Sequence, residues 1–434
     1  MEISVIGCGY VGLTTGLALA ELGNRVVLVD VLPEKLKAID EMRSPFFEPG
    51  VDEMLVKHVS SGAVRTSTDL KKAVLSTEIT FIAVGTPSRE DGSMEDGYVR
   101  SASSEIAEAI NEKNAYHVVV MKSTVVPGTT DGLIRDILEG RGLVEGSDFG
   151  LAMCPEFLRE GAAMKDSLNP DRVVIGTHDD KSFSTLKELF DPLGSKILKT
   201  TPTAAEMIKY ASNSLLATKI SFANEISRVC EDVGVDVYEI MEGVGMDFRI
   251  SPHFLRAGAG FGGSCFPKDV SALRHIASSR GISTPLLDGV MENNDIQPRH
   301  LVEVAENALG GLKGLKVLLL GLAFKPDTDD IRSTRSLPVV EALLEKEARV
   351  GGHDPKAEEN FKAEAPEIRY FHSLDSALEW ADIVFLMTEW PIYKEIDWSG
   401  FEGIKAVFDG RRAVDTDSLS GKKYWSMGTS LPRW

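Results

Sequence analysis

The stretch "ISVIGCGYVGLTTGLALAELGNRVVLVD", residues 3–30, decides the fold of the first part of the chain. It consists of an apolar run, a glycine-rich turn, a helical segment and a second apolar run that ends at Asp30. Gly7, Gly9 and Gly12 have the G-x-G-x-x-G spacing of a nucleotide-binding βαβ unit. In such a unit the first glycine permits the tight turn, the second lets the backbone approach a pyrophosphate, and the third lets helix and strand pack closely. The helix N-terminus then faces the anion.

Asp30 indicates which dinucleotide this unit binds. A carboxylate at the end of the second strand accepts hydrogen bonds from a ribose diol and repels a 2′-phosphate. The sequence therefore predicts NAD rather than NADP. The alternative is a βαβ unit whose glycines serve only the turn.

Two further apolar runs, residues 77–87 and 117–128, alternate with helical stretches and predict that a parallel sheet continues. Thr86 and Thr124 lie near the carboxyl ends of these runs. Because ligands of open α/β sheets bind at the carboxyl ends of the strands, both threonines are candidate site residues, and forming turns is their alternative role. Glu156 and Glu160 lie four residues apart around a predicted helix start, where acids are often only dipole partners.

From about Thr200 the pattern changes to one long helix, which from Thr203 onward contains no Gly or Pro until Gly234. Lys209 and Asn213 lie one turn apart on it and share a face, although a solvated face also explains a lysine there. Residues 312–355 then repeat the strand, loop, helix, strand order without G-x-G-x-x-G, with Lys325 and Arg332 on the first loop and Arg411 near a later strand end. This half is expected to bind another nucleotide or anion.

These patterns predict an α/β protein with two Rossmann-like doubly wound domains joined by a long central helix and a helical dimerisation region. We expect an N-terminal NAD-binding domain at 1–198, a central region at 199–308 that carries Cys265, and a C-terminal Rossmann-like domain at 309–434 that binds the other nucleotide or anion.

Composition excludes several classes of protein. The 434 residues include 47 Lys and Arg against 66 Asp and Glu, a net charge of −19, which argues against binding to nucleic acid or to anionic membranes. The first residues contain no signal peptide pattern, and the apolar runs are too short to span a bilayer. The four cysteines share no C-x-x-C or Cys/His spacing, so we expect neither disulfides nor a metal site, and a reducing, cytoplasmic location.

The stretch "GFGGSCFPKD", residues 260–269, raises the question of what Cys265 does. It could be part of a flexible loop, a packed thiol, a metal ligand or a nucleophile. Because Pro267 favours a first helical turn, Cys265 lies at a helix N-terminus, where the helix and Lys268 favour the thiolate. Gly262 and Gly263 are expected to permit close approach of a ligand.

A thiol beside an NAD site implies two oxidations. A thiol can capture an aldehyde as a thiohemiacetal, which loses a hydride to give a thioester that water hydrolyses. Lys209 and Asn213 fit the need for oxyanion stabilisation, and Asp269 and Glu156 fit the need for a base. An inert structural thiol is the alternative for Cys265 and the preferred interpretation of the other three cysteines, Cys8, Cys154 and Cys230.

The chain resembles the UDP-glucose and GDP-mannose dehydrogenase family over nearly its whole length. The matching stretches, in the family's order, are "GCGYVG", "FFEPG", "VGTP", "KSTVVPGT", "PEFLREG", "EMIKYASNS", "FGGSCFPKD" and "FKPDTDDIR". The resemblance implies a two-step, four-electron oxidation at C6 of a nucleotide sugar with two NAD⁺, a reaction that serves polysaccharide biosynthesis.

The resemblance also implies roles for individual residues. Cys265 is the implied nucleophile, Lys209 and Asn213 surround the reacting carbon, Asp269 helps to activate water, and Glu156 and Thr124 act in thioester hydrolysis. The implied cofactor contacts are Gly7, Gly9, Tyr10, Val11, Gly12, Asp30, Lys35, Thr86, Thr124, Glu160, Lys268 and Arg332. The implied substrate contacts are Glu156, Phe157, Leu158, Lys209, Asn213, Phe261, Gly262, Phe324, Lys325 and Arg411, with Arg256 reaching the neighbouring site of a homodimer.

The wording "GGSCFPKD" and "FDGRR" is most similar to the UDP-glucose branch of the family. The GDP-mannose branch typically carries Leu where Phe266 stands, and the N-acetylhexosamine branch departs from Gly-Ser-Cys. Residues 245–258 depart from the family pattern. The competing classes are a single-step hydroxyacid dehydrogenase, which has no use for Cys265, and a redox-sensing NAD-binding module.

Overall fold

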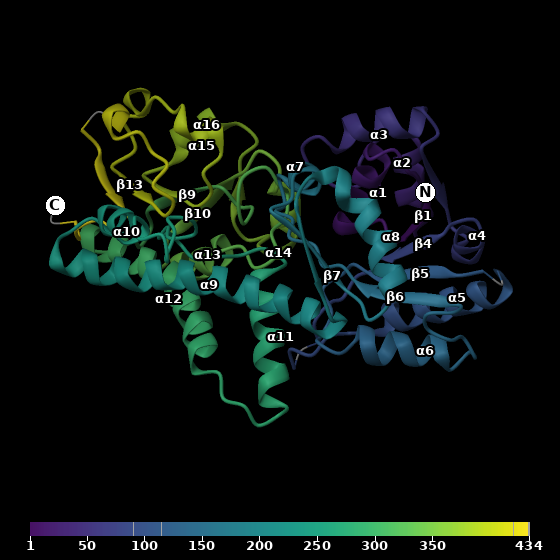
Figure 1. Ribbon diagram of the computed structural model, residues 1–434. Helices are drawn as coiled ribbons and strands as arrows, with labels where there is room; N and C mark the ends of the chain where they lie inside the picture. The colour runs from purple at the N-terminus through teal and green to yellow at the C-terminus, as the bar shows by residue number, and fades with distance from the viewer. Residues whose placement is uncertain (90, 114, 420, 433–434) are drawn as a thin grey trace. The chain divides into compact units, whose positions relative to one another are not determined.

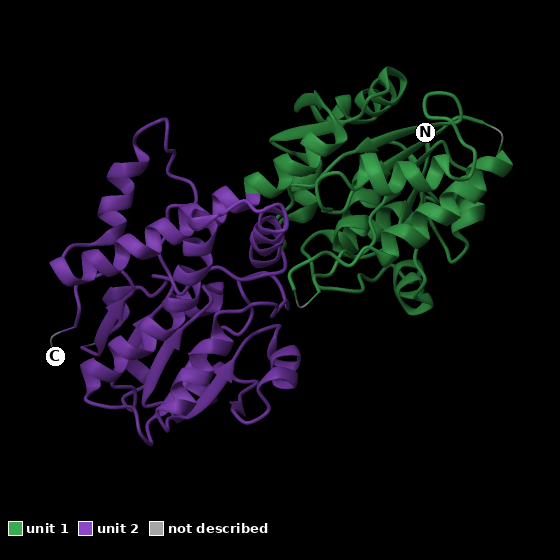
Figure 2. Ribbon diagram, turned by 90° about the horizontal axis from the view of Figure 1, so that it is seen from below, with its two compact units in different colours: residues 1–212 green, residues 213–434 purple. Residues whose placement is uncertain are grey.

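The computed structural model of the chain describes residues 1–89, 91–113, 115–419 and 421–432. It divides into two compact units, Met1–Ser212 and Asn213–Trp434 (Figure 2). Each unit contains one predominantly or fully parallel sheet with helices, so the predicted fold class is confirmed. The long helix α9 (Pro202–Val233) begins in the first unit and ends in the second. The boundaries at 198 and 308 stay predictions.

The first unit contains an eight-stranded sheet of order β3-β2-β1-β4-β5-β6-β7-β8 (Figure 1). Strand β6 pairs with β7 in the antiparallel sense and β7 with β8 in the parallel sense, so the last two strands run against the other six. The strands are β1 (Glu2–Ile6), β2 (Arg25–Val29), β3 (Val64–Ser67), β4 (Ile79–Ile82), β5 (His117–Met121), β6 (Phe149–Met153), β7 (Arg172–Gly176) and β8 (Lys196–Thr200). The helices are α1 (Tyr10–Glu21), α2 (Pro33–Asp40), α3 (Val51–Ser60), α4 (Leu70–Leu75), α5 (Gly97–Lys113), α6 (Arg135–Glu139), α7 (Ala163–Leu168) and α8 (Asp180–Phe190).

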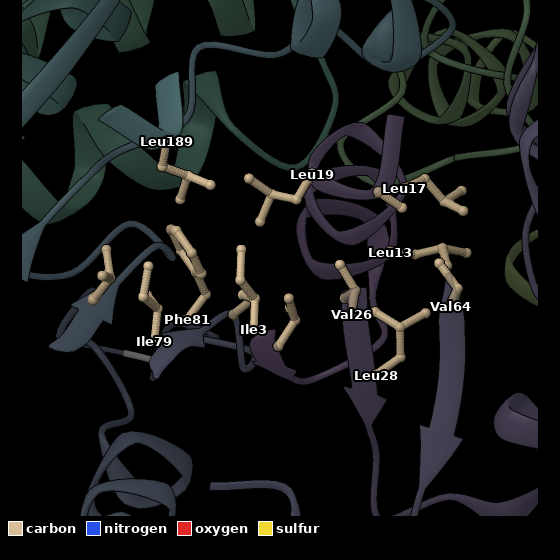
Figure 3. Packing of buried hydrophobic residues seen from close by; sticks show 14 of the residues in the cluster. Ile3, Leu13, Leu17, Leu19, Val26, Leu28, Val64, Ile79, Phe81 and Leu189 are labelled. Carbon is tan, nitrogen blue, oxygen red and sulfur yellow. The ribbon is translucent and has the colours of Figure 1, made fainter. Parts of the chain in front are cut away.

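Both faces of this sheet are covered, and its inner strands, β1, β2, β4, β5, β6 and β7, are nearly continuous apolar runs, as is typical of strands buried on both faces. The edge strands β3 and β8 contain polar residues and are partly exposed. On one face Leu13 and Leu17 of α1 and Leu189 of α8 pack with strand residues such as Ile3 and Phe81 (Figure 3). On the other face the neighbouring strand positions pack against α4 and α5. Successive strand residues therefore enter different cores.

The second unit contains a six-stranded, fully parallel sheet of order β11-β10-β9-β12-β13-β14. Its strands are β9 (Lys316–Leu320), β10 (Arg349–His353), β11 (Arg369–Tyr370), β12 (Ile383–Leu386), β13 (Ala406–Asp409) and β14 (Lys423–Ser426). Its sheet helices are α13 (Ser336–Glu345), α14 (Glu358–Glu364), α15 (Leu374–Trp380) and α16 (Pro391–Lys394). The remaining helices are α10 (Val237–Gly245), α11 (Phe266–Ser278) and α12 (Pro285–Leu309).

The long helix ends where the sequence predicts. Gly234 follows its last residue with φ +80°, a conformation that glycine adopts without strain. Of the helices in the described residues, none has the length and apolar composition that crossing a membrane requires.

We predict that Phe81→Ala lowers the free energy of unfolding of the first unit by about 3–5 kcal/mol, because the fully buried ring leaves a cavity when it is removed. The matched control is Val144→Ala, an exposed apolar position in the same unit, expected to change stability by less than about 0.5 kcal/mol. The tryptophans among the described residues all lie in the second unit, so their fluorescence would not report on the first unit, and denaturation is followed by far-UV circular dichroism. Equal effects of the two substitutions would contradict this packing.

Candidate functional site

The glycine turn after β1 has the predicted geometry. Gly7 has φ +98°, and its N–H donates to the Val29 carbonyl at 2.7 Å. A Cβ on Gly12 would lie 1.8 Å from the Gly7 carbonyl oxygen, so helix and turn pack with no room for a side chain. A Cβ on Gly9 would meet nothing within 4 Å. The backbone before Tyr10 and Val11 at the start of α1 is thus open to a ligand.

Asp30 directly follows β2 and is tied to the same turn. Its Oδ2 accepts the Cys8 N–H at 2.7 Å, and its Oδ1 accepts the Leu32 N–H at 3.0 Å. The Lys35 Nζ lies 3.8 Å from Oδ2. Each carboxylate oxygen has two acceptor sites, so one on each remains for a ribose hydroxyl. Turn and carboxylate together fit a dinucleotide.

Thr86 after β4 and Thr124 after β5 are connected by a hydrogen bond. The Thr86 hydroxyl donates to the Thr124 carbonyl at 2.9 Å, and the Ser123 hydroxyl donates to the Val84 carbonyl at 2.7 Å. Because β4 lies beside β1 in the parallel sheet, both loops emerge at the edge that carries the glycine turn. The structure therefore brings Thr86 and Thr124 together at the carboxyl end of the sheet.

Glu206, on the first turns of α9, fixes the loop after Thr124. Its Oε1 accepts the N–H of Thr130 at 2.8 Å and the hydroxyl of Thr130 at 2.6 Å, and its Oε2 accepts the Gly128 N–H at 2.5 Å. Burial raises the pKa of Glu206 to about 7, against the lowering effect of these hydrogen bonds. Nothing in the sequence pattern distinguished this acid from the other polar residues of the helix.

The loop with Glu156 and Glu160 differs from the expectation. Regular helix begins only with α7 at Ala163, so neither acid stands at a helix start and the dipole interpretation was wrong. The loop is held by Glu48, whose carboxylate accepts the N–H groups of Gly161 at 2.6 Å and Ala163 at 2.7 Å.

The Tyr10 hydroxyl also accepts the Gly161 N–H, at 2.9 Å, which links this loop to the helix that follows the glycine turn. Glu48 lies within "FFEPG", and the sequence predicts no role for it. A lone acid in a loop gives no signal of its bonding partners.

Lys209 on α9 pairs with Glu156, and both side chains are buried. The ammonium nitrogen also lies 5.5 Å from the centroid of the Phe157 ring, and Leu158 is half-buried beside it in the chain. A buried ammonium and carboxylate require each other, since either one alone would be an uncompensated charge. The pair places an acid and a cation in one partly apolar environment.

In the second unit, Cys265 is the N-cap residue of α11, as the sequence predicts. Its carbonyl accepts the Asp269 N–H at 2.8 Å, and its sulfur lies 3.6 Å from the Ser264 hydroxyl oxygen. The thiol is half-buried, whereas the other three cysteines are buried. A helix N-terminus favours the thiolate.

Asp269, one turn into α11, is buried and holds two partners. Its Oδ2 accepts the Asn213 Nδ2–H at 2.6 Å, and its Oδ1 lies 2.9 Å from the Lys268 ammonium. Asn213 follows Lys209 by one turn of α9. The positive charge of Lys268, expected near the thiol, is therefore directed at Asp269.

The two glycines before Cys265 are explained by the protein's own packing. A Cβ on Gly262 would lie 2.5 Å from the Ser333 carbonyl oxygen, and a Cβ on Gly263 would lie 2.7 Å from the Phe324 ring. Gly263 also has φ +83°. Both glycines therefore make room for the loop after β9, and not for a ligand.

The predicted cations of this unit have different surroundings. The Arg411 Nε–H donates to the Met387 carbonyl at 2.8 Å and its Nη1 to the Gly260 carbonyl at 3.3 Å. Arg332 is exposed and pairs with Asp330, while its own carbonyl accepts the Gly263 N–H at 2.8 Å. Lys325 is half-exposed on the same loop, and Arg256 is exposed after α10.

The turn after β9 repeats the first turn bond by bond. Gly321 has φ +100° and donates to the His353 carbonyl, and Asp354 after β10 accepts the Leu322 N–H at 2.7 Å. Asp354, however, also accepts the Trp390 indole N–H at 3.2 Å and three further backbone N–H groups. Its capacity is used within the protein, so it is not a second ribose acceptor.

The remaining cysteines have the surroundings of structural thiols. Burial raises the pKa of Cys8 and of Cys154. Cys230 lies in the small core between α9 and α10. Within the described ranges, no group of three or more His, Cys, Asp or Glu side chains is arranged to hold a metal ion.

Comparison with known proteins identifies three consecutive segments. Residues 1–194 match the NAD binding domain of the UDP-glucose/GDP-mannose dehydrogenase family, residues 203–296 its central domain and residues 318–416 its UDP binding domain. The prediction of NAD as cofactor is thereby confirmed.

Similar proteins cover nearly the whole chain. UDP-glucose 6-dehydrogenase YwqF of Bacillus subtilis is 42% identical over 99% of this chain and 98% of its own length. UDP-glucose 6-dehydrogenase AglM of Haloferax volcanii is 42% identical over 95% of this chain and 97% of its own length. The solved structure of a UDP-glucose dehydrogenase from Pyrobaculum islandicum is 41% identical, covers 99% of this chain and 98% of that chain, and has a TM-score of 0.92.

We predict that Glu206 makes the first unit less stable as pH rises. The raised pKa means that the folded state holds the proton more tightly than the unfolded state, so stability is greatest below the ordinary pKa of a glutamate and is lost as pH rises through about 7. The difference between the pKa of Glu206 in the folded state and the ordinary pKa of a glutamate corresponds to about 3 kcal/mol of stability. Glu206→Gln should lack this loss, measured by urea denaturation followed by circular dichroism between pH 5 and 8. Parallel profiles for the two proteins would refute the assignment.

Proposed function

The chain belongs to the UDP-glucose/GDP-mannose dehydrogenase family, and we propose from this membership that it oxidises C6 of UDP-glucose to UDP-glucuronate in two NAD-dependent steps. The observation that carries the proposal is the half-buried thiol of Cys265 at the N-terminus of α11, one turn from Asp269. The relatives that bear the name UDP-glucose 6-dehydrogenase support this choice of substrate.

NAD⁺ would be held by the glycine turn, by Asp30 with Lys35 nearby, and by Thr86 and Thr124, with Glu160, Lys268 and Arg332 as further proposed contacts. The bound cofactor supplies the hydride acceptor for each oxidation. The overall reaction consumes one alcohol, two NAD⁺ and one water, and gives one carboxylate, two NADH and three protons.

Cys265 would give the second oxidation its covalent intermediate. Its thiolate adds to the aldehyde carbon, a C–S bond forms, and the carbonyl oxygen gains a proton to give a thiohemiacetal. Loss of the C6 hydride and the hydroxyl proton leaves a thioester. Water then adds to the thioester carbon, the C–S bond breaks, and the thiolate is regenerated with the carboxylate product.

The buried polar pairs would serve the oxygen and the water. The Lys209 ammonium and the Asn213 amide can donate to the developing oxyanion, which is the usual role of such donors. Glu156 and Asp269 are the proposed bases that would accept a proton from water, and each carboxylate is oriented by a donor within hydrogen-bond distance. Thr124 would assist hydrolysis of the thioester.

The nucleotide sugar would contact the second unit through its first loop and the segment before Cys265. The proposed contacts there are Phe261, Gly262, Phe324, Lys325 and Arg411. Phe157 and Leu158 are further proposed contacts of the substrate. The match of residues 318–416 to a UDP binding domain supports a uridine nucleotide. All four cysteines are free thiols, which fits the cytoplasmic location that we also propose.

A substrate panel tests the choice of sugar nucleotide. UDP-glucose, GDP-mannose and two UDP-N-acetylhexosamines are compared by NADH absorbance at equal concentration. We expect the highest kcat/KM with UDP-glucose and two NADH per sugar consumed. A higher kcat/KM with another sugar nucleotide would make that nucleotide the assigned substrate. Formation of one NADH per sugar together with a stable aldehyde product would contradict the thioester route.

We predict that Cys265→Ala abolishes glucuronate formation, by at least about 10³-fold, because the covalent intermediate cannot form. NAD binding should be unchanged, since the glycine turn and Asp30 are untouched. Cys230→Ala, which alters a buried thiol of the same unit, is the control and should keep near-normal turnover. Full turnover of Cys265→Ala would eliminate the nucleophile.

We also propose that the protein is a homodimer through the outer face of α9. Leu215, Phe222 and Val229 lie seven residues apart on this helix and are 62%, 49% and 55% exposed. A spacing of seven keeps side chains on one helix face, and exposed apolar side chains along such a face are typical of helix pairing. Arg256 is exposed and would reach the second copy's site.

Phe222→Asp should therefore convert the dimer to a monomer, because a carboxylate would be buried in an apolar contact. Light scattering after size-exclusion chromatography gives the mass directly. Val144→Asp, at an exposed apolar position away from α9, is the control and should leave the mass unchanged. A monomeric wild type, or a Phe222→Asp variant with wild-type mass, would exclude this interface.

A further inference from the structure

We propose that Asn294 on α12 is a positioning residue for Cys265, acting through the backbone of Phe261. The inference rests on the proposed function, because it assigns to Asn294 the orientation of the thiol that the proposed reaction uses. Asn294 touches neither the thiol nor any residue to which we assign a role in hydride or proton transfer.

The Asn294 carboxamide makes a reciprocal pair of hydrogen bonds with one residue. Its Oδ1 accepts the Phe261 N–H at 2.8 Å, and its Nδ2–H donates to the Phe261 carbonyl at 3.0 Å. The Asn294 side chain is 1% exposed, so water does not replace these bonds when they are lost. Both main-chain groups of Phe261 are thereby fixed to a helix that is distant in the sequence.

Only an amide fits this arrangement. A carboxylate of the same size would accept the Phe261 N–H, but its second oxygen would face the Phe261 carbonyl without a proton. Gly260 has φ +106°, and a Cβ there would lie 2.8 Å from the Asn294 Oδ1. The glycine and the asparagine are therefore matched, since the bond to Phe261 needs the space that Gly260 leaves.

The clamp is connected to the thiol by aromatic packing. The Phe261 ring meets the Phe266 ring edge to face at 6.0 Å, and Phe266 is the first residue of α11, next to Cys265. Phe261 and Phe266 also pack in one cluster with Val270 of α11 and Val290 of α12. A shift of Phe261 would therefore move the first turn of α11 and, with it, Cys265 at the N-terminus of this helix.

The chain offers a matched control next to this residue. Asn293 is 4% exposed on the same helix, and its amide also makes two hydrogen bonds, accepting from Arg228 at 2.6 Å and donating to the Ser221 carbonyl. Both partners belong to α9 and not to the segment before Cys265. Loss of Asn293 should destabilise the helix packing without moving the thiol.

The test compares Asn294→Ala, Asn294→Asp and Asn293→Ala by the rate at which iodoacetamide alkylates Cys265 as a function of pH. Peptide mass spectrometry assigns the label to Cys265. We expect both Asn294 variants to alkylate about tenfold more slowly at pH 7, with the midpoint of the pH profile moved upward, because the thiolate is no longer held at the helix N-terminus. Asn293→Ala should keep the wild-type profile within about twofold.

Turnover gives the second readout. Both Asn294 variants should lose at least about tenfold in kcat with an unchanged Kd for NAD, which a general loss of stability would not produce. Hydrogen exchange of the wild type needs no variant, and the Phe261 N–H should be protected as strongly as the amides of α12. Wild-type alkylation in both Asn294 variants, equal effects of Asn293→Ala, or rapid exchange at Phe261 would overturn the inference.

The two proposals fail separately. Full turnover of Cys265→Ala would remove the nucleophile while leaving any effect of Asn294 on alkylation intact. A normal alkylation profile in the Asn294 variants, together with an inactive Cys265→Ala, would remove the positioning role and keep the proposed function.

Discussion

Backbone packing around residues 260–263 sets the position of the thiol. The chain there carries glycine at 260, 262 and 263 because the Asn294 amide, the Ser333 carbonyl and the Phe324 ring occupy the space that side chains would need. The residues just before this segment are also held in place. The Gly258 N–H donates to the Asn224 side chain of α9, and the Ala259 N–H donates to the Gly410 carbonyl in the loop after β13. A sulfur at the end of so constrained a segment has little freedom, which suits the proposed nucleophile, because it would have to reach one carbon atom of the substrate.

The two sheets show how one turn geometry serves two purposes. Gly7 with Asp30 and Gly321 with Asp354 make the same main-chain bonds at equivalent positions. At Asp30 each oxygen accepts one backbone N–H and keeps capacity for a hydroxyl, whereas at Asp354 the Trp390 indole and additional backbone donors fill the carboxylate. The first turn is built for a dinucleotide, and the second serves mainly to organise the loop that carries Phe324 and Lys325.

The sequence predicts what depends on local spacing. The glycine turn, the ends of α9 and the N-cap position of Cys265 follow from periodicity and from Gly and Pro positions, and the structure has them where expected. What it does not predict are bonds between distant segments. Glu48, Glu206 and Asn294 are ordinary polar residues in their own stretches, and only folding brings them to the N–H groups that they hold. The apolar pattern also does not predict the reversed direction of β7 and β8, because the pattern shows where strands lie but not how they pair.

The central claim is that Cys265 carries the sugar covalently between the two oxidations. The most direct measurement is the mass of the Cys265 peptide after the Glu156→Gln variant is mixed with UDP-glucose and NAD⁺ and quenched in acid within one turnover. The account predicts an acyl adduct on that peptide alone. The mass of the modified peptide should equal the mass of the unmodified peptide plus that of UDP-glucose, less four hydrogens, and mild base should remove the adduct. A peptide of unmodified mass during active NADH formation, or an adduct on a different residue, would contradict it.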